Sequence, residues 1–463
     1  MSLKSTLAQL DLAAPRFALA PQAVTILSAP DEFYSQLKAR ILGAQRRIFL
    51  ATLYIGKSED ELISVLDQSL QKNNALDVHI LTDGLRGTRE APQKSTASLL
   101  APLVAKYPAR VHVSMYQTPA LNGLAKLMVP QRFNEGWGLQ HMKLYGFDDD
   151  IVLSGANLSK DYFTNRQDRY IAISNKEVTE YFYQLHKAVS YLSYQLQHED
   201  RSRGPSDNFK LVWTSDCPSP ADPKGYRKEA SRILAPLLKP DTKVSPADDK
   251  GTYLYPIAQF TPLIGDTASN ELKAMGLLTK MLKGNFDWTL TAGYFNISER
   301  LQEGLLKSTP GTAKVITAGE KANGFYQSKG VSSQIPDLYS MLAKRFIKKA
   351  EHIQPRIQML EWENGQYNKP NGWSYHAKGL WVMPRGESPV LTVIGSSNFT
   401  KRAYAHDLEA GAVLVTGSPE LRAKMAAEVA NLEKHTTPKT SRDYNKRPTL
   451  IQRLFVRLMG NKL

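Results

Sequence analysis

The chain has 463 residues, of which 42% are hydrophobic, enough for two or three domains with buried cores. A single cysteine excludes a disulfide framework and cysteine-based zinc or iron–sulfur sites. The net charge of +15 favours anionic partners, which include nucleic acids, acidic membranes and phosphorylated substrates. A basic surface without a dedicated partner is the alternative, and composition alone does not choose among these classes.

The N-terminal segment, residues 1–17, is weakly basic and contains Asp11, so it makes a poor transit or signal peptide. No targeting segment is therefore evident. No stretch of the chain approaches the roughly 18 apolar residues that a membrane-spanning helix requires. We expect a soluble or peripheral protein.

Strands and helices alternate through the first half. Residues 47–55 (RIFLATLYI) predict a strand that ends near Tyr54, a helix follows, and residues 78–82 predict a second strand. A basic loop with Arg86 and Arg89 comes directly after it. Because loops at the carboxyl ends of strands are common ligand sites, these side chains are predicted to bind substrate, with solvated charge as the alternative.

An apolar segment, residues 119–132, precedes the first histidine motif and contains two basic residues. We interpret it as a lipid-facing lip over the active site. A strand or helix of the core is the alternative.

The first histidine motif places His141 two residues before Lys143 at the start of a predicted strand, so both side chains lie on one face. The strand turns at Asp148 and returns to Asn157. Asp168 follows eleven residues later. Strand, turn and returning strand thus bring an imidazole, an ammonium and a carboxamide toward one place.

The second half repeats this order. A strand over 288–295 ends near Tyr294, a second strand covers 314–317, and a basic loop with Lys321 and Lys329 follows. The polar stretch between the halves, rich in Pro, Asp and Lys, has the composition of a linker. The chain therefore predicts an α/β protein with a mixed sheet in each half.

The second histidine motif makes the repeat specific. His376 and Lys378 each lie 235 positions after their counterparts, and Asn398 and Glu409 each lie 241 after theirs. Met383 stands where the second copy would match Asp148. The two halves are therefore not equivalent, and we assign the nucleophile to the complete first copy.

This set of side chains suits a phosphoryl group. Imidazole attacks phosphorus or moves a proton, lysine offers positive charge to non-bridging oxygens, and asparagine adds an N–H donor. Two halves related by a pseudo-twofold axis supply two imidazoles, one for each side of the phosphorus. A single His-x-Lys pair is usually an ordinary surface pair, but two matched copies argue against chance.

Here the chain resembles the phospholipase D superfamily, on the segments HMKLYGFD (141–148) with SGANLS, and YHAKGLW (375–381) with GSSNF. Within it, residues 154–170, 375–381 and 394–410 are similar to phosphatidylglycerophosphate synthases of the eukaryotic, mitochondrial type. Bacterial phosphatidylserine synthase is a more distant match. The resemblance covers nearly the whole chain and implies two phospholipase D-like lobes related by a pseudo-twofold axis, each a mixed sheet flanked by helices.

The resemblance implies a phosphatidyltransferase that uses CDP-diacylglycerol and sn-glycerol 3-phosphate and releases CMP, on the route to cardiolipin. His141 would form the phosphohistidine and His376 would act as general acid and then base. Asp168 and Glu409 are candidates for holding the imidazole tautomers, with interface salt bridges as the alternative. The family needs no metal or cofactor. The implied location is the matrix side of the inner mitochondrial membrane.

The predicted regions and site residues are as follows. The regions are an N-terminal lobe (1–205), a linker (206–250), a C-terminal lobe (251–440) and a basic amphipathic segment (441–463) predicted to bind acidic membranes, with packing against the protein as the alternative. The catalytic set comprises His141, Lys143, Asp148, Asn157, Asp168, His376, Lys378, Asn398 and Glu409. The substrate-binding set comprises Tyr54, Arg86, Arg89, Ser159, Tyr294, Lys321, Lys329 and Thr400.

Three other functions share these residues: a phosphatidylserine synthase, a lipid hydrolase and a nuclease. They differ in the acceptor, which is serine, water or a nucleic-acid phosphodiester, and no nucleic-acid partner is expected. A basic membrane-binding scaffold with a decayed site is the non-enzymatic alternative, which Met383 slightly favours. The oligomeric state is not readable from the sequence.

Overall fold

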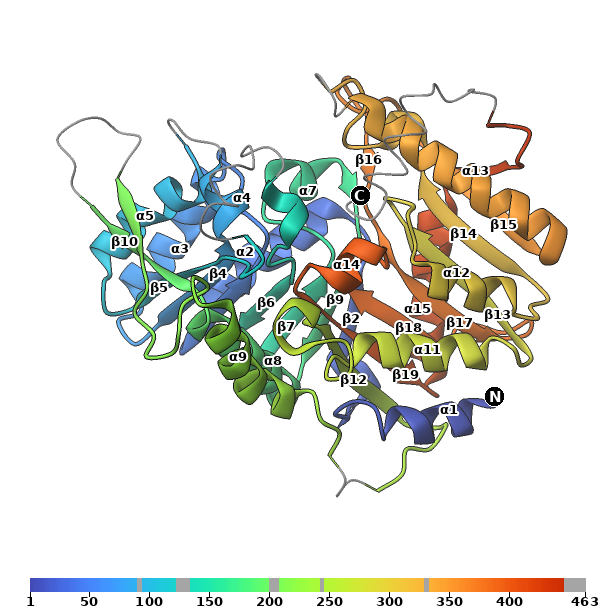
Figure 1. Cartoon of the computed structure of the whole chain (residues 1–463), viewed down its shortest axis with the longest axis horizontal. Helices are drawn as coiled ribbons and strands as arrows, with labels where there is room; N and C mark the ends of the chain where they lie inside the picture. The colour runs from blue at the N-terminus through green and yellow to red at the C-terminus, as the bar shows by residue number, and fades with distance from the viewer. Residues whose placement is uncertain (90–93, 122–133, 200–207, 242–244, 329–332, 445–463) are drawn as a thin grey trace.

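The computed structural model describes residues 1–89, 94–121, 134–199, 208–241, 245–328 and 333–444. Within these residues the chain forms two lobes, each built on a nine-stranded mixed sheet (Figure 1). A small parallel pair, β8 (Arg166–Gln167) with β16 (Ser374–Tyr375), joins one lobe to the other. The predicted architecture of two α/β lobes is confirmed.

The first sheet has parallel strands at its centre and antiparallel strands toward its edges. Its order is β11 (Phe209–Val212), β10 (Tyr194–His198), β5 (Val111–Tyr116), β4 (Asp77–Asp83), β3 (Arg47–Ala51), β6 (Leu144–Phe147), β7 (Asp150–Ser154), β9 (Tyr170–Ser174) and β2 (Val24–Leu27). The helices of this lobe are α2 (Pro30–Gly43), α3 (Asp60–Lys72), α4 (Gly84–Thr88), α5 (Thr96–Lys106), α7 (Lys160–Thr164) and α8 (Lys176–Tyr191).

The second sheet repeats the order of the eight strands from β10 to β2, and its ninth strand, β1, lies at the edge opposite to that of β11. It runs β1 (Phe17–Ala18), β12 (Thr252–Gln259), β19 (Glu409–Thr416), β18 (Leu391–Gly395), β17 (Lys378–Pro384), β13 (Phe286–Ala292), β14 (Ala313–Ala318), β15 (Ile357–Trp362) and β20 (Thr436–Lys439). Its helices are α10 (Thr261–Ile264), α11 (Glu271–Met281), α12 (Glu299–Leu306), α13 (Ile335–Ile353), α14 (Lys401–Ala405) and α15 (Pro419–Glu433).

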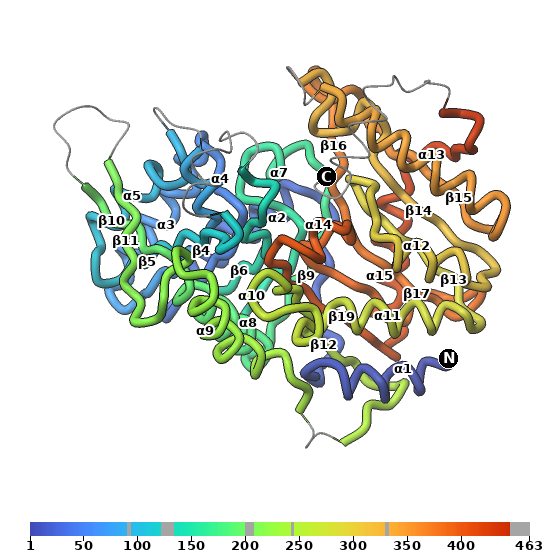
Figure 2. Tube along the Cα trace, viewed as in Figure 1, coloured from blue at the N-terminus to red at the C-terminus, as the bar shows by residue number. Residues whose placement is uncertain are grey.

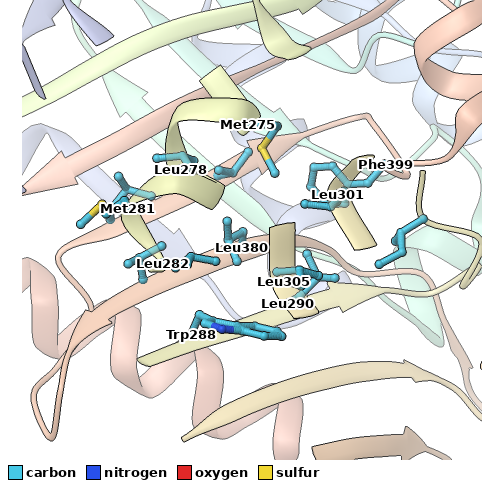
Figure 3. Close-up of a cluster of buried hydrophobic side chains, with 14 of the residues drawn as sticks. Met275, Leu278, Met281, Leu282, Trp288, Leu290, Leu301, Leu305, Leu380 and Phe399 are labelled. Atoms are coloured by element: carbon cyan, nitrogen blue, oxygen red, sulfur yellow. The ribbon is translucent and has the colours of Figure 1, made fainter. Parts of the chain in front are cut away.

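Helices cover the sheets because each carries one apolar face. In α3, Leu62, Leu66 and Leu70 recur every four residues and are fully buried. In the second lobe, α11 and α12 pack their leucines and methionines over strands β13 and β17, and Figure 3 shows Leu278 and Leu301 above the sheet. The strands next to the histidine motifs are thus held in place by apolar packing against these helices.

The lobe interface combines a shared apolar cluster with one buried ion pair. Leu153 of the first lobe and Ile394 of the second belong to the same cluster. Arg169 donates from Nε and Nη2 to Glu428 at 2.8 and 3.0 Å, and its guanidinium lies 3.8 Å from the ring centroid of Trp381. Removing one member of such a pair leaves an uncompensated buried charge, so the pair opposes separation of the lobes.

The predicted boundaries are wrong at two places. The segment expected to be a linker, 206–250, contains β11 and helix α9 (Pro223–Leu237), whose Tyr226, Ala230 and Leu234 are fully buried. The polar composition concealed this narrow apolar face. The N-terminal segment belongs to the second lobe, because β1 pairs with β12 and helix α1 (Leu3–Leu10) packs into that lobe's core (Figure 2).

Every helix among the described residues is too short or too polar to cross a lipid bilayer. Residues 445–463, where the amphipathic segment is predicted, lie outside the described residues.

The close approach of Arg169 to β17 generates a stability prediction. A Cβ on Gly379 would lie 1.8 Å from Arg169 Nη1 and 2.7 Å from the Val393 carbonyl oxygen. We expect Gly379→Ala to lower the free energy of unfolding by about 3 kcal/mol, because it displaces the buried guanidinium. Chemical denaturation measures the change. Gly43→Ala, where the new Cβ meets nothing within 4 Å, is the control, and equal stabilities of the two variants would contradict the prediction.

Candidate active site

The first histidine is held by the second lobe. The backbone N–H of His141 donates to the Leu408 carbonyl oxygen at 2.9 Å, next to a parallel bridge between Gln140 and Leu408. The imidazole Nδ1 then lies 2.9 and 3.0 Å from the two carboxylate oxygens of Glu409. The imidazole of one lobe is thus paired with a carboxylate of the other.

The second histidine is held in the same way by the first lobe. The pairing of β16 with β8 directs the His376 N–H to the Gln167 carbonyl oxygen at 2.8 Å. Its Nδ1 lies 2.7 Å from Asp168 Oδ2. Because both Nδ1 atoms face a carboxylate, Nε2 is the ring nitrogen that each histidine keeps for chemistry.

The two lysines lie fully buried beside the imidazoles. Lys143 Nζ donates to the His141 carbonyl oxygen at 2.7 Å. Lys378 Nζ lies 2.9 Å from His376 Nδ1 and 3.7 Å from Asp168. The charge of Lys378 acts on His141 and Lys143 of the other lobe, which indicates that both motifs contribute to one electrostatic site.

The environment keeps both imidazoles neutral. Burial, and then the charge of Lys378, lower the pKa of His376 to about 3. Burial and the charge of Lys143 lower the pKa of His141 well below its ordinary value. A neutral imidazole has a free lone pair on Nε2, so nucleophilic attack needs no prior deprotonation.

The two orienting carboxylates differ in charge. Burial raises the pKa of Glu409 to about 7, while burial lowers the pKa of Lys143 to the same value. Burial opposes ionisation of Asp168 too, but the charge of Lys378 and the hydrogen bond from His376 prevail and lower its pKa. The site is therefore asymmetric in charge at neutral pH.

The neighbouring side chains explain part of this asymmetry. The Ser396 hydroxyl donates to Glu409. Gly155 occupies the equivalent place in the first lobe, 241 residues earlier, where a Cβ would lie 2.6 Å from both Asp168 Oδ1 and Lys378 Nζ. Glycine thus makes room for the lysine to approach Asp168.

Of the two predicted asparagines, the first reaches the site through a tyrosine. Asn157 Nδ2 donates to the Tyr162 hydroxyl at 3.2 Å, and that hydroxyl lies 3.3 Å from His376 Nε2. Asn398 is half-buried at the end of β18.

The predicted substrate-binding residues of the first lobe gather near Tyr54. The Arg86 guanidinium lies 4.5 Å from the centroid of the Tyr54 ring, and both Arg86 and Arg89 pair with Glu135. The Tyr54 hydroxyl lies 3.5 Å from Ser159 Oγ. These side chains form a polar group in the first lobe, and the charges of Asp161 and Arg166 act on Tyr54.

The predicted substrate-binding residues of the second lobe lie at separate places. Tyr294 lies edge-on to His376, with ring centroids 5.3 Å apart. Thr400 caps α14, since its hydroxyl accepts the Ala403 N–H at 3.1 Å. Lys321 is exposed on the loop after β14. Lys329, and the predicted lip over 119–132 from residue 122 on, lie outside the described residues.

Asp148 corrects the predicted catalytic set. It stands at the β6–β7 turn, with φ of 51°, seven residues or about 20 Å of extended chain from His141. Its carboxylate accepts the backbone N–H groups of Gln45, Arg46 and Arg47 at 2.7, 2.8 and 3.0 Å. Asp148 therefore anchors the start of β3 and does not line the site.

The sequence interpretation missed Tyr162, Arg166 and Ser396. Arg166 lies 4.5 Å from the ring centroid of Tyr162, so it stands one side chain away from His376. Aligning the two halves at their 241-residue offset shows that all three residues differ from their counterparts, and that difference is the signal that would have found them.

Within the described part of the chain, no group of three or more His, Cys, Asp or Glu side chains could hold a metal ion. The site therefore offers imidazole, ammonium, carboxylate and phenol groups for its chemistry.

Comparisons with known proteins identify relatives over most of the chain. A family model described as "Cardiolipin synthase, PLD-like domain" matches residues 37–188. The chain is 45% identical to a CDP-diacylglycerol–glycerol-3-phosphate 3-phosphatidyltransferase of Saccharomyces pastorianus, over 93% of this chain and 86% of that one. The same name belongs to a Schizosaccharomyces pombe protein, 40% identical over 98% and 97% of the two chains. A mouse relative named as mitochondrial is 35% identical over 90% and 79%.

Among solved structures, the phosphatidylserine synthase of Haemophilus influenzae superimposes with a TM-score of 0.77. It is 20% identical and covers 100% of this chain and 99% of its own. At that identity the likeness establishes the two-lobed fold.

Proposed function

The chain belongs to the CDP-diacylglycerol–glycerol-3-phosphate 3-phosphatidyltransferases, enzymes of the phospholipase D superfamily, and we propose that it forms phosphatidylglycerophosphate through a phosphohistidine on His141. The lipid donor is CDP-diacylglycerol and the acceptor is sn-glycerol 3-phosphate. This reaction is the first committed step toward phosphatidylglycerol and cardiolipin. The observation that carries the mechanism is the pair of crossed imidazole–carboxylate contacts at one site.

In the first step, His141 Nε2 attacks the phosphorus on the diacylglycerol side of the diphosphate. The new N–P bond replaces the P–O bond to CMP. His376 gives the leaving oxygen a proton, and the negative charge of the bound diphosphate favours the protonated imidazole that this role requires. Lys143 and Lys378 stabilise the charge on the non-bridging oxygens.

In the second step, His376 takes the proton from a hydroxyl of glycerol 3-phosphate. That oxygen attacks the phosphorus, the N–P bond breaks, and His141 returns to its neutral form with its electron pair restored. Glu409 and Asp168 keep the same tautomers through both steps, because each holds an Nδ1 proton. The chemistry thus needs only side chains that the site contains.

The group around Tyr54, Arg86 and Arg89 supports a role in binding the anionic substrates, since it combines guanidinium groups with an aromatic ring beside the site. We propose the same role for the loop that carries Lys321 and Lys329. Asn157 would act as a donor toward the phosphoryl group, as would Asn398.

The membrane contact and the location are proposals. A lipid donor requires access to a bilayer, and the basic segment 441–463 has the pattern of an interfacial anchor for an acidic surface. The name of the mouse relative supports a mitochondrial location. We propose the matrix face of the inner membrane.

The first test compares acceptors. Purified protein with CDP-diacylglycerol in mixed micelles should release CMP much faster with glycerol 3-phosphate than with serine or water. His141→Asn should lower the rate by about three orders of magnitude or more, because the nucleophile is gone, while vesicle binding is unchanged. His352→Asn, at an exposed position of α13, is the matched control. Release with serine alone would reassign the chain as a phosphatidylserine synthase.

The second test locates the covalent intermediate. CDP-diacylglycerol labelled on the lipid-side phosphorus, added without acceptor to His376→Ala, should leave label on His141, because the base for the second step is missing. Peptide mapping under alkaline conditions identifies the modified residue. Label on another residue of the wild-type protein, including His376, would reverse or remove the role assigned to His141.

The third test uses pH. Because the pKa of Lys143 is about 7, its charge is present below that pH and lost above it, while Glu409 ionises over the same range. Both changes weaken attraction for the diphosphate, so kcat/KM for CDP-diacylglycerol should fall as pH rises from 6 to 9. Lys143→Met should give a low value that falls less over this range, because only the ionisation of Glu409 remains. Lys349→Met, at an exposed position, should keep the wild-type profile.

A further inference from the structure

The two lobes carry the same ion pair with its polarity reversed. In the first lobe, Asp161 on α7 pairs with Arg166 through Nη2 at 2.6 Å. At the equivalent positions of the second lobe, 241 residues later, Arg402 on α14 pairs with Asp407 through Nε at 3.2 Å. A duplicated ion pair would be expected to keep its direction, so the reversal distinguishes the two sides of the site.

The reversal gives the two imidazoles opposite neighbours. Arg166 lies two residues before Asp168, and Asp407 lies two residues before Glu409. Each of these carboxylates orients the histidine of the other lobe. Arg166 therefore acts on His376, and Asp407 acts on His141. Arg166 contributes to the lowered pKa of His376, whereas at His141 the carboxylate of Asp407 opposes the lowering of the pKa and Arg402 adds to it.

The surroundings of Arg166 suit an anionic ligand. Its side chain is 9% exposed, and its Nε donates to Ser374 Oγ at 2.9 Å. The guanidinium lies over the Tyr162 ring, whose hydroxyl is 3.3 Å from His376 Nε2. An arginine has five N–H donors, which is more than the contacts with Ser374 and Asp161 use. A guanidinium can donate two parallel hydrogen bonds to one phosphate.

The loop after β14 approaches Arg166 closely at Gly324. A Cβ on Gly324 would lie 3.2 Å from Arg166 Nη2 and 3.1 Å from the Tyr294 hydroxyl. The loop backbone therefore passes close to the guanidinium. In the second lobe, Ala403 replaces Tyr162, so that side lacks the tyrosine.

We propose that Arg166 binds the phosphate that CMP and glycerol 3-phosphate have in common, so that leaving group and acceptor use one subsite in turn beside His376. This inference rests on the proposed transfer reaction. It places the leaving group of the first step and the acceptor of the second step on the same side of the site, beside His376. CMP and glycerol 3-phosphate each keep a phosphate that is not transferred, and both need His376 within reach. The diacylglycerol ester carries no such second charge and belongs on the side of Asp407.

The test measures the two phosphate ligands separately in the full-length protein. Arg166→Gln should raise the KM for glycerol 3-phosphate and the inhibition constant of CMP by similar factors, about ten- to hundredfold. With unphosphorylated glycerol as acceptor, kcat/KM should change little, so the preference for glycerol 3-phosphate falls. Arg166→Lys keeps the positive charge but loses the bidentate donor geometry, so it should raise both constants by a smaller factor. This variant provides the test if the glutamine variant fails to fold.

Controls separate this proposal from the reaction itself. Arg422→Gln removes an arginine of α15 that is ion-paired with Glu387 and lies outside the site. This variant should leave all these constants unchanged. If the wild-type protein transfers phosphatidyl groups but Arg166→Gln keeps both constants, the inference fails and the reaction stands. If the losses follow Arg402→Gln instead, the orientation is the reverse of the one proposed. If the wild-type protein releases no CMP with any acceptor, the proposed function itself fails.

Discussion

The orientation of both motif histidines depends on hydrogen bonds that cross between the lobes. His141 is oriented by Glu409 and His376 by Asp168, so neither lobe contains a complete imidazole–carboxylate pair. A carboxylate on Nδ1 holds the tautomer that exposes Nε2. Small movements between the lobes would therefore misdirect both nitrogens together, and the interface is part of the active site.

That dependence explains why a buried ion pair lies at the interface. Arg169 follows Asp168 directly in the chain and crosses to Glu428, Trp381 and the backbone of β17 and β18. Such pairs contribute little net stability compared with apolar packing, but they penalise every arrangement that leaves a charge unpaired. The residue next to the orienting carboxylate thus specifies one register of the lobes, and Gly379 gives it the space.

The duplicated spacing predicted the fold and most of the site, because a repeat of His-x-Lys, Asn and acid at matched offsets already implies two similar lobes. It did not predict which acid meets which histidine, since spacing along a chain says nothing about how two lobes face each other. Asp148 was misassigned because it completes a sequence motif, whereas its carboxylate binds the backbone at the far turn. Helix α9 was hidden because its few buried side chains lie within a polar, proline-containing segment.

Duplication alone would give a site with identical halves, but the proposed mechanism gives the two histidines different roles, one as nucleophile and the other as general acid and base. The structure departs from symmetry beside the orienting carboxylates: Ser396 donates to Glu409 where the first lobe has Gly155, and Asp407 stands where the first lobe has Arg166. Each change is local and leaves the strand pairing of both sheets intact. The backbone therefore keeps the symmetry of the two lobes, while a few side chains break it beside the two histidines.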